Sequence, residues 1–318
     1  MRDECDFHPM TESPVDQHRR YFRQLRTLRR LLSWEPAYFF AAAHLARISS
    51  PVRHERDKFE AAWRLLGHAN PREIWGRFLQ RVGVSTAAAF LQGDGSHLPV
   101  CIDEDDPEGV LAHARRHGTL FLTYHHQFAY LFCSALGHLG VPLNALTMDP
   151  ALGPLHALLP EFGKNIFGDS ERHFRGGRYY FLNPDNPRFH LLHVLRDLLR
   201  GTSIVSANDF DNPFPQFKSH PGKLLGAVID SPTGVIPFAL QHPVMISAGY
   251  LDWQGGNRFK IFLRVLKRPD EQLSLAEVYA RYMAQLEEIA LRRPEIWEGL
   301  LGLKESPYRR PSATNAPG

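Results

Sequence analysis

Two adjacent histidines, His125 and His126, follow a short apolar run in the stretch GTLFLTYHHQFAYL, residues 118–131. The ordinary pKa of a histidine is about 6.5, so its imidazole can take up or release a proton near neutral pH. Successive side chains of an extended chain point to opposite faces, so only one of the two can face a given pocket. We expect one histidine to act as a general base while the other supports it, or both only to bind nearby backbone.

The element that must position these histidines is a buried strand. A glycine followed by apolar and β-branched residues is typical of such a strand, and sites in open α/β sheets lie where strands end. Similar runs alternate with helical patterns, which predicts an α/β fold with a mixed β-sheet flanked by helices. The expected strands span residues 119–124, 143–148, 202–208, 234–240, 244–251 and 259–266, and expected helices include 189–201 and about 275–292.

Helical periodicity predicts a helical subdomain over residues 17–95, ahead of an α/β core at 96–302. Apolar residues recur at helical spacing in RDKFEAAWRLLGH and in PREIWGRFLQRVGVSTAAAFL, where Pro71 suits a helix start. Residues 1–16 and 303–318 lack this periodicity, so we expect a flexible leader and a flexible tail. The acidic DEDDPEG is expected to be a solvated loop that opens a helix.

The first expected helix, QHRRYFRQLRTLRRLL at residues 17–32, is amphipathic and basic. Its apolar face carries Phe22, Leu25, Leu28 and Leu32, and its other face carries Arg19, Arg23, Arg26 and Arg30. These arginines would suit an acidic carrier protein or an anionic membrane surface, or they form an ordinary solvated face. The apolar piece that follows, AYFFAAAHLARI, is shorter than the roughly 20 residues needed to span a bilayer, so no transmembrane anchor is expected.

Composition excludes several classes of protein. A net charge of +3 on 318 residues gives no global electrostatic footprint for nucleic acid. Three scattered cysteines suit neither a disulfide framework nor a zinc site, and no signal peptide opens the chain. We therefore expect a cytoplasmic protein without bound metal or cofactor, in contact with the inner membrane face if the basic helix binds lipid.

Four blocks of sequence follow the order and spacing of motifs in one enzyme family. Besides GTLFLTYHHQFAYL, they are LLRGTSIVSANDFDNP, HPGKLLGAVIDSPTGVIPFALQHPVMISAGY and RRPEIWEGL. Together they resemble the bacterial lipid A biosynthesis (lauroyl/myristoyl) acyltransferases of the lysophospholipid acyltransferase-like superfamily, over roughly residues 53–300. The resemblance implies that His125 is the base and that Asp209 ends a neighbouring strand. It also implies a helix and then a strand around Ile236-Pro237.

The chain departs from that family at the acid that should follow the histidine. Five residues after His125, where the family has Glu or Asp, stands Tyr130, whose ordinary pKa of about 10 keeps it neutral. Another group must then orient the imidazole, or the chemistry is weaker. The candidates are Asp209, Asp211 and His126, with Asp209 the first choice; the alternative is that Asp209 only caps its own turn.

The resemblance implies acyl transfer from a thioester of coenzyme A or an acyl carrier protein to a hydroxyl or amine acceptor. The substrate is expected to contact Tyr124, Gln127, Asp211 and Lys223. Two other hypotheses stay open, namely a catalytically silent acyl-binding or scaffold protein and a different His-dependent thioester reaction, hydrolysis or condensation. In the signature of condensation domains, three residues separate two histidines from an Asp-Gly pair. This chain has Tyr130 and Leu131 where that Asp-Gly pair would stand, so the signature is not matched.

Overall fold

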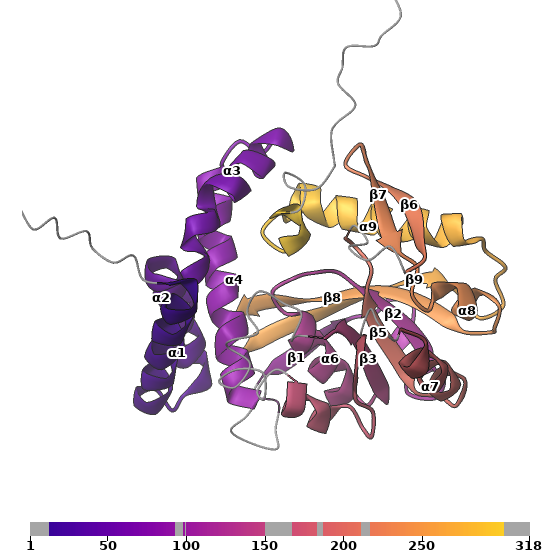
Figure 1. Ribbon diagram of the computed structural model, residues 1–318. Coiled ribbons are helices and arrows are strands. Elements are labelled where there is room, and N and C mark those ends of the chain that lie inside the picture. Colours follow the sequence, from indigo (N-terminus) through magenta and orange to yellow (C-terminus); the bar gives the residue numbers. More distant parts are fainter. Residues whose placement is uncertain are drawn as a thin grey trace, which may run out of the picture.

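The computed structural model describes residues 13–92, 98, 100–149, 167–182, 187–210 and 217–301. Within them, seven strands form one sheet in the order β1-β9-β8-β2-β5-β3-β4 (Figure 1). All neighbouring strands of this sheet pair in parallel except β8 and β9, which form an antiparallel hairpin. The strands are β1 (Cys101–Asp105), β2 (Thr119–Thr123), β3 (Leu143–Met148), β4 (Tyr179–Leu182), β5 (Ser203–Ala207), β8 (Met245–Gly255) and β9 (Arg258–Lys267). The expected mixed α/β fold is therefore confirmed.

Strand β2 lies in the middle of the sheet, and all five of its residues are buried. Phe121 joins the apolar cluster on one face, whereas Leu120 and Leu122 join the cluster on the other. Burial on both faces explains why the strand is a continuous apolar run. The residue just before the strand is Gly118, and a Cβ at this position would lie 1.9 Å from the carbonyl oxygen of Leu198. Only glycine therefore fits there.

Helices cover both faces of the sheet (Figure 1). Helix α9 (Leu275–Arg292) lies over one face together with a hairpin of β6 (Ser219–Leu224) and β7 (Ala227–Pro232), and α6 (Ala129–His138) lies on the other. The remaining helices of this part are α5 (Val110–Ala114), η5 (Ser170–His173), α7 (Pro187–Leu199), α8 (Ile236–Leu240) and η6 (Glu298–Leu301). The expected helices at 189–201 and 275–292 are confirmed as α7 and α9.

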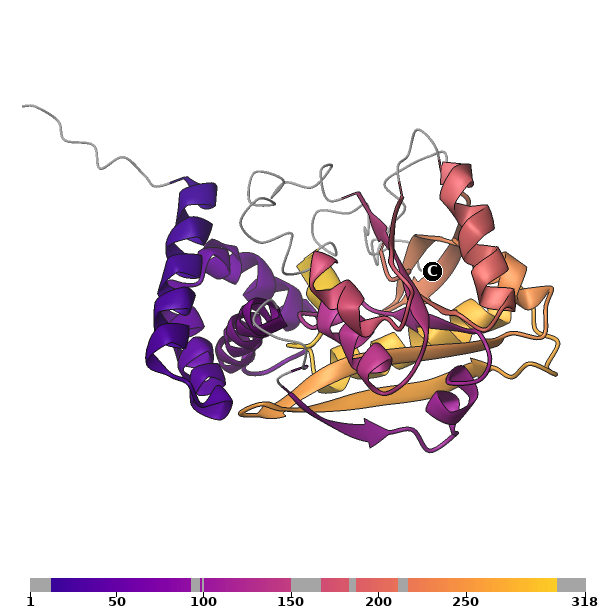
Figure 2. The ribbon, with the colours of Figure 1, turned by 90° about the horizontal axis from the view of Figure 1, so that it is seen from below.

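The N-terminal helices pack together beside the sheet (Figure 2). They are α1 (Pro14–Leu31), α2 (Glu35–Ser49), η1 (Pro51–Glu55), α3 (Arg56–Leu65) and α4 (Pro71–Gln92). Helices α2 and α4 approach closely at Gly83, where a Cβ would lie 2.3 Å from the carbonyl oxygen of Ala42. No helix in the described part of the chain combines the length and the apolar character needed to cross a bilayer.

Helix α1 starts earlier than the sequence suggested, inside the segment expected to be a flexible leader. Ser13 caps it by accepting a hydrogen bond from the backbone N–H of Asp16 at 3.2 Å, and Pro14 occupies the first turn. These residue types favour a helix start, so the leader prediction is wrong for residues 13–16. Residues 1–12 and 302–318 lie outside the described residues.

The strand expected at 234–240 is wrong, because this segment contains helix α8. A short apolar run without periodicity does not distinguish a strand from a buried helix, and Pro237 in the first turn favours the helix. The helix that the family resemblance implied before it is also absent, since β6 and β7 occupy residues 219–232. Their turn places Leu225 and Gly226 at φ values of 52° and 78°, as tight hairpin turns require.

Two edge strands of the sheet were not expected from the sequence. The acidic segment predicted to be a loop begins as β1, where Asp103 pairs with Arg258 and Asp105 pairs with Lys260 and Arg264 of the neighbouring β9. These cross-strand ion pairs make a charged edge strand feasible. The second half of the prediction is confirmed, because Asp106 accepts from the first backbone N–H groups of α5. Strand β4 forms the opposite edge.

Candidate functional site

The register of two parallel strands brings His125 and Asp209 together. Thr123, the last residue of β2, is paired with Ala207, the last residue of β5. His125 and Asp209 each lie two residues beyond these paired ends, so both reach the carboxyl edge of the sheet at the same place. This edge is where binding and catalytic groups of open α/β sheets are found.

The Asp209 carboxylate holds the imidazole and the backbone of His125 at the same time. Its Oδ1 lies 2.6 Å from His125 Nδ1, and its Oδ2 accepts the backbone N–H of His125 at 2.8 Å. The indole N–H of Trp297 also donates to Oδ2, at 2.7 Å. The orienting contact predicted for Asp209 is therefore present, and the three groups that contact its buried carboxylate can each donate a hydrogen bond to it.

The charges of the pair stabilise each other. Burial alone would lower the pKa of His125, but the negative charge and hydrogen bond of Asp209 outweigh it and raise that pKa above its ordinary value. Burial alone would raise the pKa of Asp209, yet the positive charge of His125 and the donated hydrogen bonds hold it below its ordinary range. The His125 side chain is 47% exposed, and among the described residues no hydrogen bond uses its Nε2. Nε2 is thus the nitrogen left for a substrate proton.

His126, the other candidate catalytic histidine, points to the interior and does not share the solvent-exposed position of His125. Its Nδ1 accepts the backbone N–H of Phe128 at 3.2 Å, so Nε2 carries the proton and faces Thr123 Oγ1 at 3.3 Å. Burial is the main cause that lowers the pKa of His126 to about 3. A histidine held neutral in this way supports the fold rather than proton transfer.

We expect His126 to make the protein sensitive to acid. The folded-state pKa is about 3 against 6.5 in the unfolded chain, so unfolding takes up one more proton between these values. The contribution of neutral His126 to the free energy of unfolding is present in full above pH 6.5. It falls by about 1.4 kcal/mol per pH unit as the pH drops from 6.5 towards 3. Urea unfolding of wild type and of His126→Gln is measured across this pH range. The slope of the unfolding free energy against pH should be steeper for wild type, by the amount that corresponds to one proton taken up on unfolding. Equal slopes would contradict the assignment.

Among the described residues Tyr130 makes no hydrogen bond with His125, so it is not the group that orients the imidazole, and a catalytic role for it stays a prediction. It lies in the first turn of α6, where its ring packs edge-on against Phe167 with centroids 5.3 Å apart. Burial raises the pKa of Tyr130 to about 12, so the phenol stays neutral. The carboxylate that the sequence lacks after His125 is supplied from the neighbouring strand end instead.

The residues expected to bind substrate are dispersed. Tyr124 is buried, stacks on Tyr282 with ring centroids 4.9 Å apart, and donates its phenol hydrogen to Gln285. Gln127 is also buried and donates to the backbone carbonyl of Glu295 at 3.0 Å. Both side chains thus belong to the core, and their contact with a substrate stays a prediction.

The other two expected substrate contacts have different outcomes. Lys223 is exposed in β6, and none of the hydrogen bonds or ion pairs of His125 and Asp209 within the described residues involves it. Asp211, also a candidate to orient His125, lies outside the described residues.

Two residues that complete the site, Trp297 and Glu298, were given no contact in it from the sequence, although both lie in the block RRPEIWEGL. The backbone of Trp297 forms an isolated antiparallel bridge with His126, and the backbone N–H of Glu298 donates to the carbonyl of His125 at 2.8 Å. Burial, together with the charge of Asp209, raises the pKa of Glu298 to about 7, although His125 opposes the shift. No local pattern in this block predicts its contact with the end of a strand more than 150 residues away.

Within the described residues, no group of three or more His, Cys, Asp or Glu side chains is arranged to hold a metal ion. No protein-family model matches this chain, and no curated protein matches it in sequence. The family resemblance therefore stays a prediction, and a proposal about function depends on the geometry around His125.

Proposed function

We propose that this protein transfers an acyl group from a thioester, on coenzyme A or an acyl carrier protein, to a hydroxyl or amine acceptor. The observation that carries the proposal is the His125–Asp209 pair, a half-exposed imidazole held by a buried carboxylate at the carboxyl edge of the sheet. In hydrolases and transferases this arrangement defines a general base, because the carboxylate fixes the tautomer and stabilises the imidazolium. The thioester class comes from the motif resemblance.

In the proposed reaction, Nε2 of His125 takes the proton of the acceptor hydroxyl or amine as its oxygen or nitrogen attacks the thioester carbonyl. A tetrahedral intermediate forms, and Asp209 stabilises the positive charge on the imidazole. Collapse breaks the carbon–sulfur bond, and the leaving thiolate takes the proton from Nε2. The products are an ester or amide and a free thiol, with His125 returned to its neutral form.

The geometry favours an enzyme over a silent scaffold protein. All three contacts of Asp209 stabilise its charge, and that charge acts on the one side chain of the group that faces solvent. An acyl-binding scaffold has no need of an exposed imidazole with a raised pKa. Hydrolysis would use the same pair with water as the acceptor, so the test must separate transfer from hydrolysis.

The test is to incubate the purified protein with thioesters of coenzyme A and of acyl carrier protein, over several chain lengths, with and without a panel of alcohols and amines. Thiol release is measured continuously and the products are identified by mass spectrometry. The proposal expects release that depends on an acceptor, which gains the mass of the acyl group. Release of free fatty acid without an acceptor would indicate hydrolysis, and no release with any thioester would favour the scaffold hypothesis.

The arginine face of α1, formed by Arg19, Arg23, Arg26 and Arg30, is proposed to recruit the acidic acyl carrier protein. All four arginines are exposed, and three of them line a surface cavity of about 340 Å³ with Asp16 and Phe22. Part of this face also serves the fold, since Arg26 lies over the Phe90 ring at 5.2 Å.

Reversing the four charges of the arginine face to Glu is expected to weaken carrier-protein binding at least tenfold, with wild-type binding weakening as salt rises. The measurement is titration calorimetry at two salt concentrations, repeated with anionic vesicles. A matched control reverses four exposed arginines elsewhere: Arg72, Arg116, Arg178 and Arg200. An equal loss of carrier-protein binding in both variants would mean that only the net charge of the protein matters. Binding to anionic vesicles but not to the carrier protein would favour a membrane surface as the partner.

A further inference from the structure

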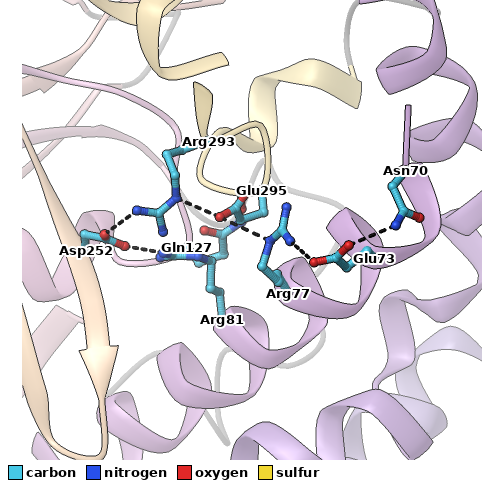
Figure 3. Close-up of polar contacts among 8 residues, drawn as sticks. All are labelled: Asn70, Glu73, Arg77, Arg81, Gln127, Asp252, Arg293 and Glu295. Carbon is cyan, nitrogen blue, oxygen red and sulfur yellow. Dashed lines mark hydrogen bonds and ion pairs between the residues drawn. The ribbon is translucent and has the colours of Figure 1, made fainter. Parts of the chain in front are cut away.

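Arg81, Asp252, Arg293 and Glu295 form an ion cluster that extends from the interior to the surface, where the Arg293 side chain is 46% exposed (Figure 3). Asp252 accepts hydrogen bonds from Arg81 and, at 3.2 Å, from Nη1 of Arg293. The Nε of Arg293 donates to Glu295 at 2.8 Å. Both carboxylates and Arg81 are no more than 4% exposed, so each charge depends on its partners for compensation.

The cluster joins three separate parts of the fold. Arg81 comes from α4, Asp252 from β8, and Arg293 and Glu295 from the segment that follows α9. Figure 3 shows Arg293 between the two carboxylates, with Arg77 of α4 reaching Glu295 from the other side at 3.6 Å. The segment after α9 is thus attached both to the sheet and to the N-terminal helices.

The segment after α9 and the ion cluster also contact the residues that follow the candidate base in sequence. Gln127 donates to the backbone carbonyl of Glu295, and the Arg81 guanidinium lies over the Phe128 ring at 5.8 Å. Two residues after Glu295, Trp297 donates to Asp209, and the next N–H binds the carbonyl of His125. A short stretch of chain, residues 293–298, therefore connects the ion cluster to the His125–Asp209 pair. Its first residues belong to the cluster, and its last two residues hydrogen-bond the pair.

We infer that the ion cluster positions the His125–Asp209 pair, with Arg293 as the positioning residue that holds residues 293–298 in place. The planar guanidinium of Arg293 binds one carboxylate through Nε and the other through Nη1. This fork fixes the direction of the chain just before Trp297, and Trp297 in turn fixes Asp209. The use of the pair in catalysis rests on the proposed function, but its positioning is a property of the protein without substrate.

Arg293→Lys separates geometry from charge. Lysine keeps the positive charge, so the electrostatic effect of position 293 on His125 is retained, but a single ammonium does not reproduce the fork. If the cluster positions the site, residues 293–298 loosen, the Trp297 hydrogen bond opens more often, and His125 loses part of its contact with Asp209. The pKa of His125 then falls towards its ordinary value of about 6.5.

Two NMR measurements on the substrate-free protein test this. One is the titration of the His125 imidazole, and the other is hydrogen exchange of the Trp297 indole N–H. We expect Arg293→Lys to lower the His125 pKa and to speed the indole exchange by about tenfold, which corresponds to ~1.4 kcal/mol in the local opening free energy. The matched control is Arg292→Lys, which makes the same change at an adjacent arginine that pairs only with Glu288 among the described residues. Both quantities should stay at wild-type values in the control.

The inference is overturned if Arg293→Lys lowers the melting temperature while both NMR quantities stay at wild-type values, since the cluster would then only stabilise the fold. Should Arg293→Lys not fold, Gln127→Met removes the uncharged link to Glu295 and should move both quantities in the same direction. Unchanged quantities in that variant would also overturn the inference. Because no substrate enters these measurements, their outcome is separate from that of the thioester assay.

Discussion

Replacing His125 by alanine is expected to lower acceptor-dependent thiol release by about 10⁴-fold, the upper end of what a general base contributes. The imidazole is half exposed and its Nε2 is the nitrogen available to a substrate, so its loss removes the proton acceptor without disturbing the core. Thiol release is measured with the thioester and acceptor that give the highest wild-type rate. Thermal unfolding followed by circular dichroism shows whether the variant is folded.

The control for this variant is His44→Ala, which removes an exposed histidine of α2 and should leave the rate unchanged. A folded His125→Ala protein that transfers acyl groups as fast as wild type would remove His125 as the base. The acyltransferase proposal in its present form would not survive that result.

Asp209→Asn is expected to have an effect of similar size, about 10³–10⁴-fold, because it forces the wrong tautomer on His125. The three groups around the carboxylate all donate hydrogen bonds. An amide has one oxygen, which will accept from the backbone N–H of His125 and from Trp297, so its NH₂ group faces Nδ1. Nδ1 must then accept, Nε2 carries the proton, and the nitrogen facing the substrate is no longer a base.

Two further measurements test this explanation of the Asp209→Asn effect. Because Asp209 acts through His125, the double variant should be no slower than His125→Ala alone, which a double-mutant cycle measures. Activity needs the neutral imidazole, so the wild-type rate should fall as the pH drops through the raised pKa of His125. In Asp209→Asn the residual activity should persist to lower pH, since the larger of the two charges that raise this pKa is gone and only that of Glu298 remains.

Tyr130→Glu provides the contrast to Asp209→Asn. It restores a carboxylate five residues after His125, yet Asp209 already occupies Nδ1, so the change should be neutral or harmful. A clear gain in rate would mean that Asp209 is not the functional partner of His125.

The centre of the sheet could be predicted from the sequence because β2 and β5 are continuous runs buried on both faces. The family resemblance, which implies that Asp209 ends a neighbouring strand, made Asp209 the first choice as the partner of His125. The direction of each side chain after the strand end could not be predicted. Tyr124, His126 and Gln127 surround His125 in sequence, and all three turn inward to hydrogen-bond partners that are fixed by packing.

The errors lie where local sequence is compatible with two structures. The run at 234–240 suits a strand or a short helix equally well, and tertiary packing selects α8. The acidic β1 is a strand only because β9 supplies opposite charges beside it. Trp297 and the ion cluster depend on contacts between segments far apart in the chain, for which a single sequence carries no periodic or local signal.

His125 and Asp209 each follow the end of their strand, β2 or β5, by one intervening residue, and this matched spacing has an evolutionary consequence. Because strand side chains alternate with a period of two, inserting or deleting one residue between the strand end and His125 would turn the imidazole away from Asp209 and expose a neighbour in its place. A point substitution in this segment changes the contacts of one side chain. A change in length would instead turn the side chains that face the core outward and those that face solvent inward. Descendants of this chain should therefore diversify here by substitution and accumulate insertions elsewhere.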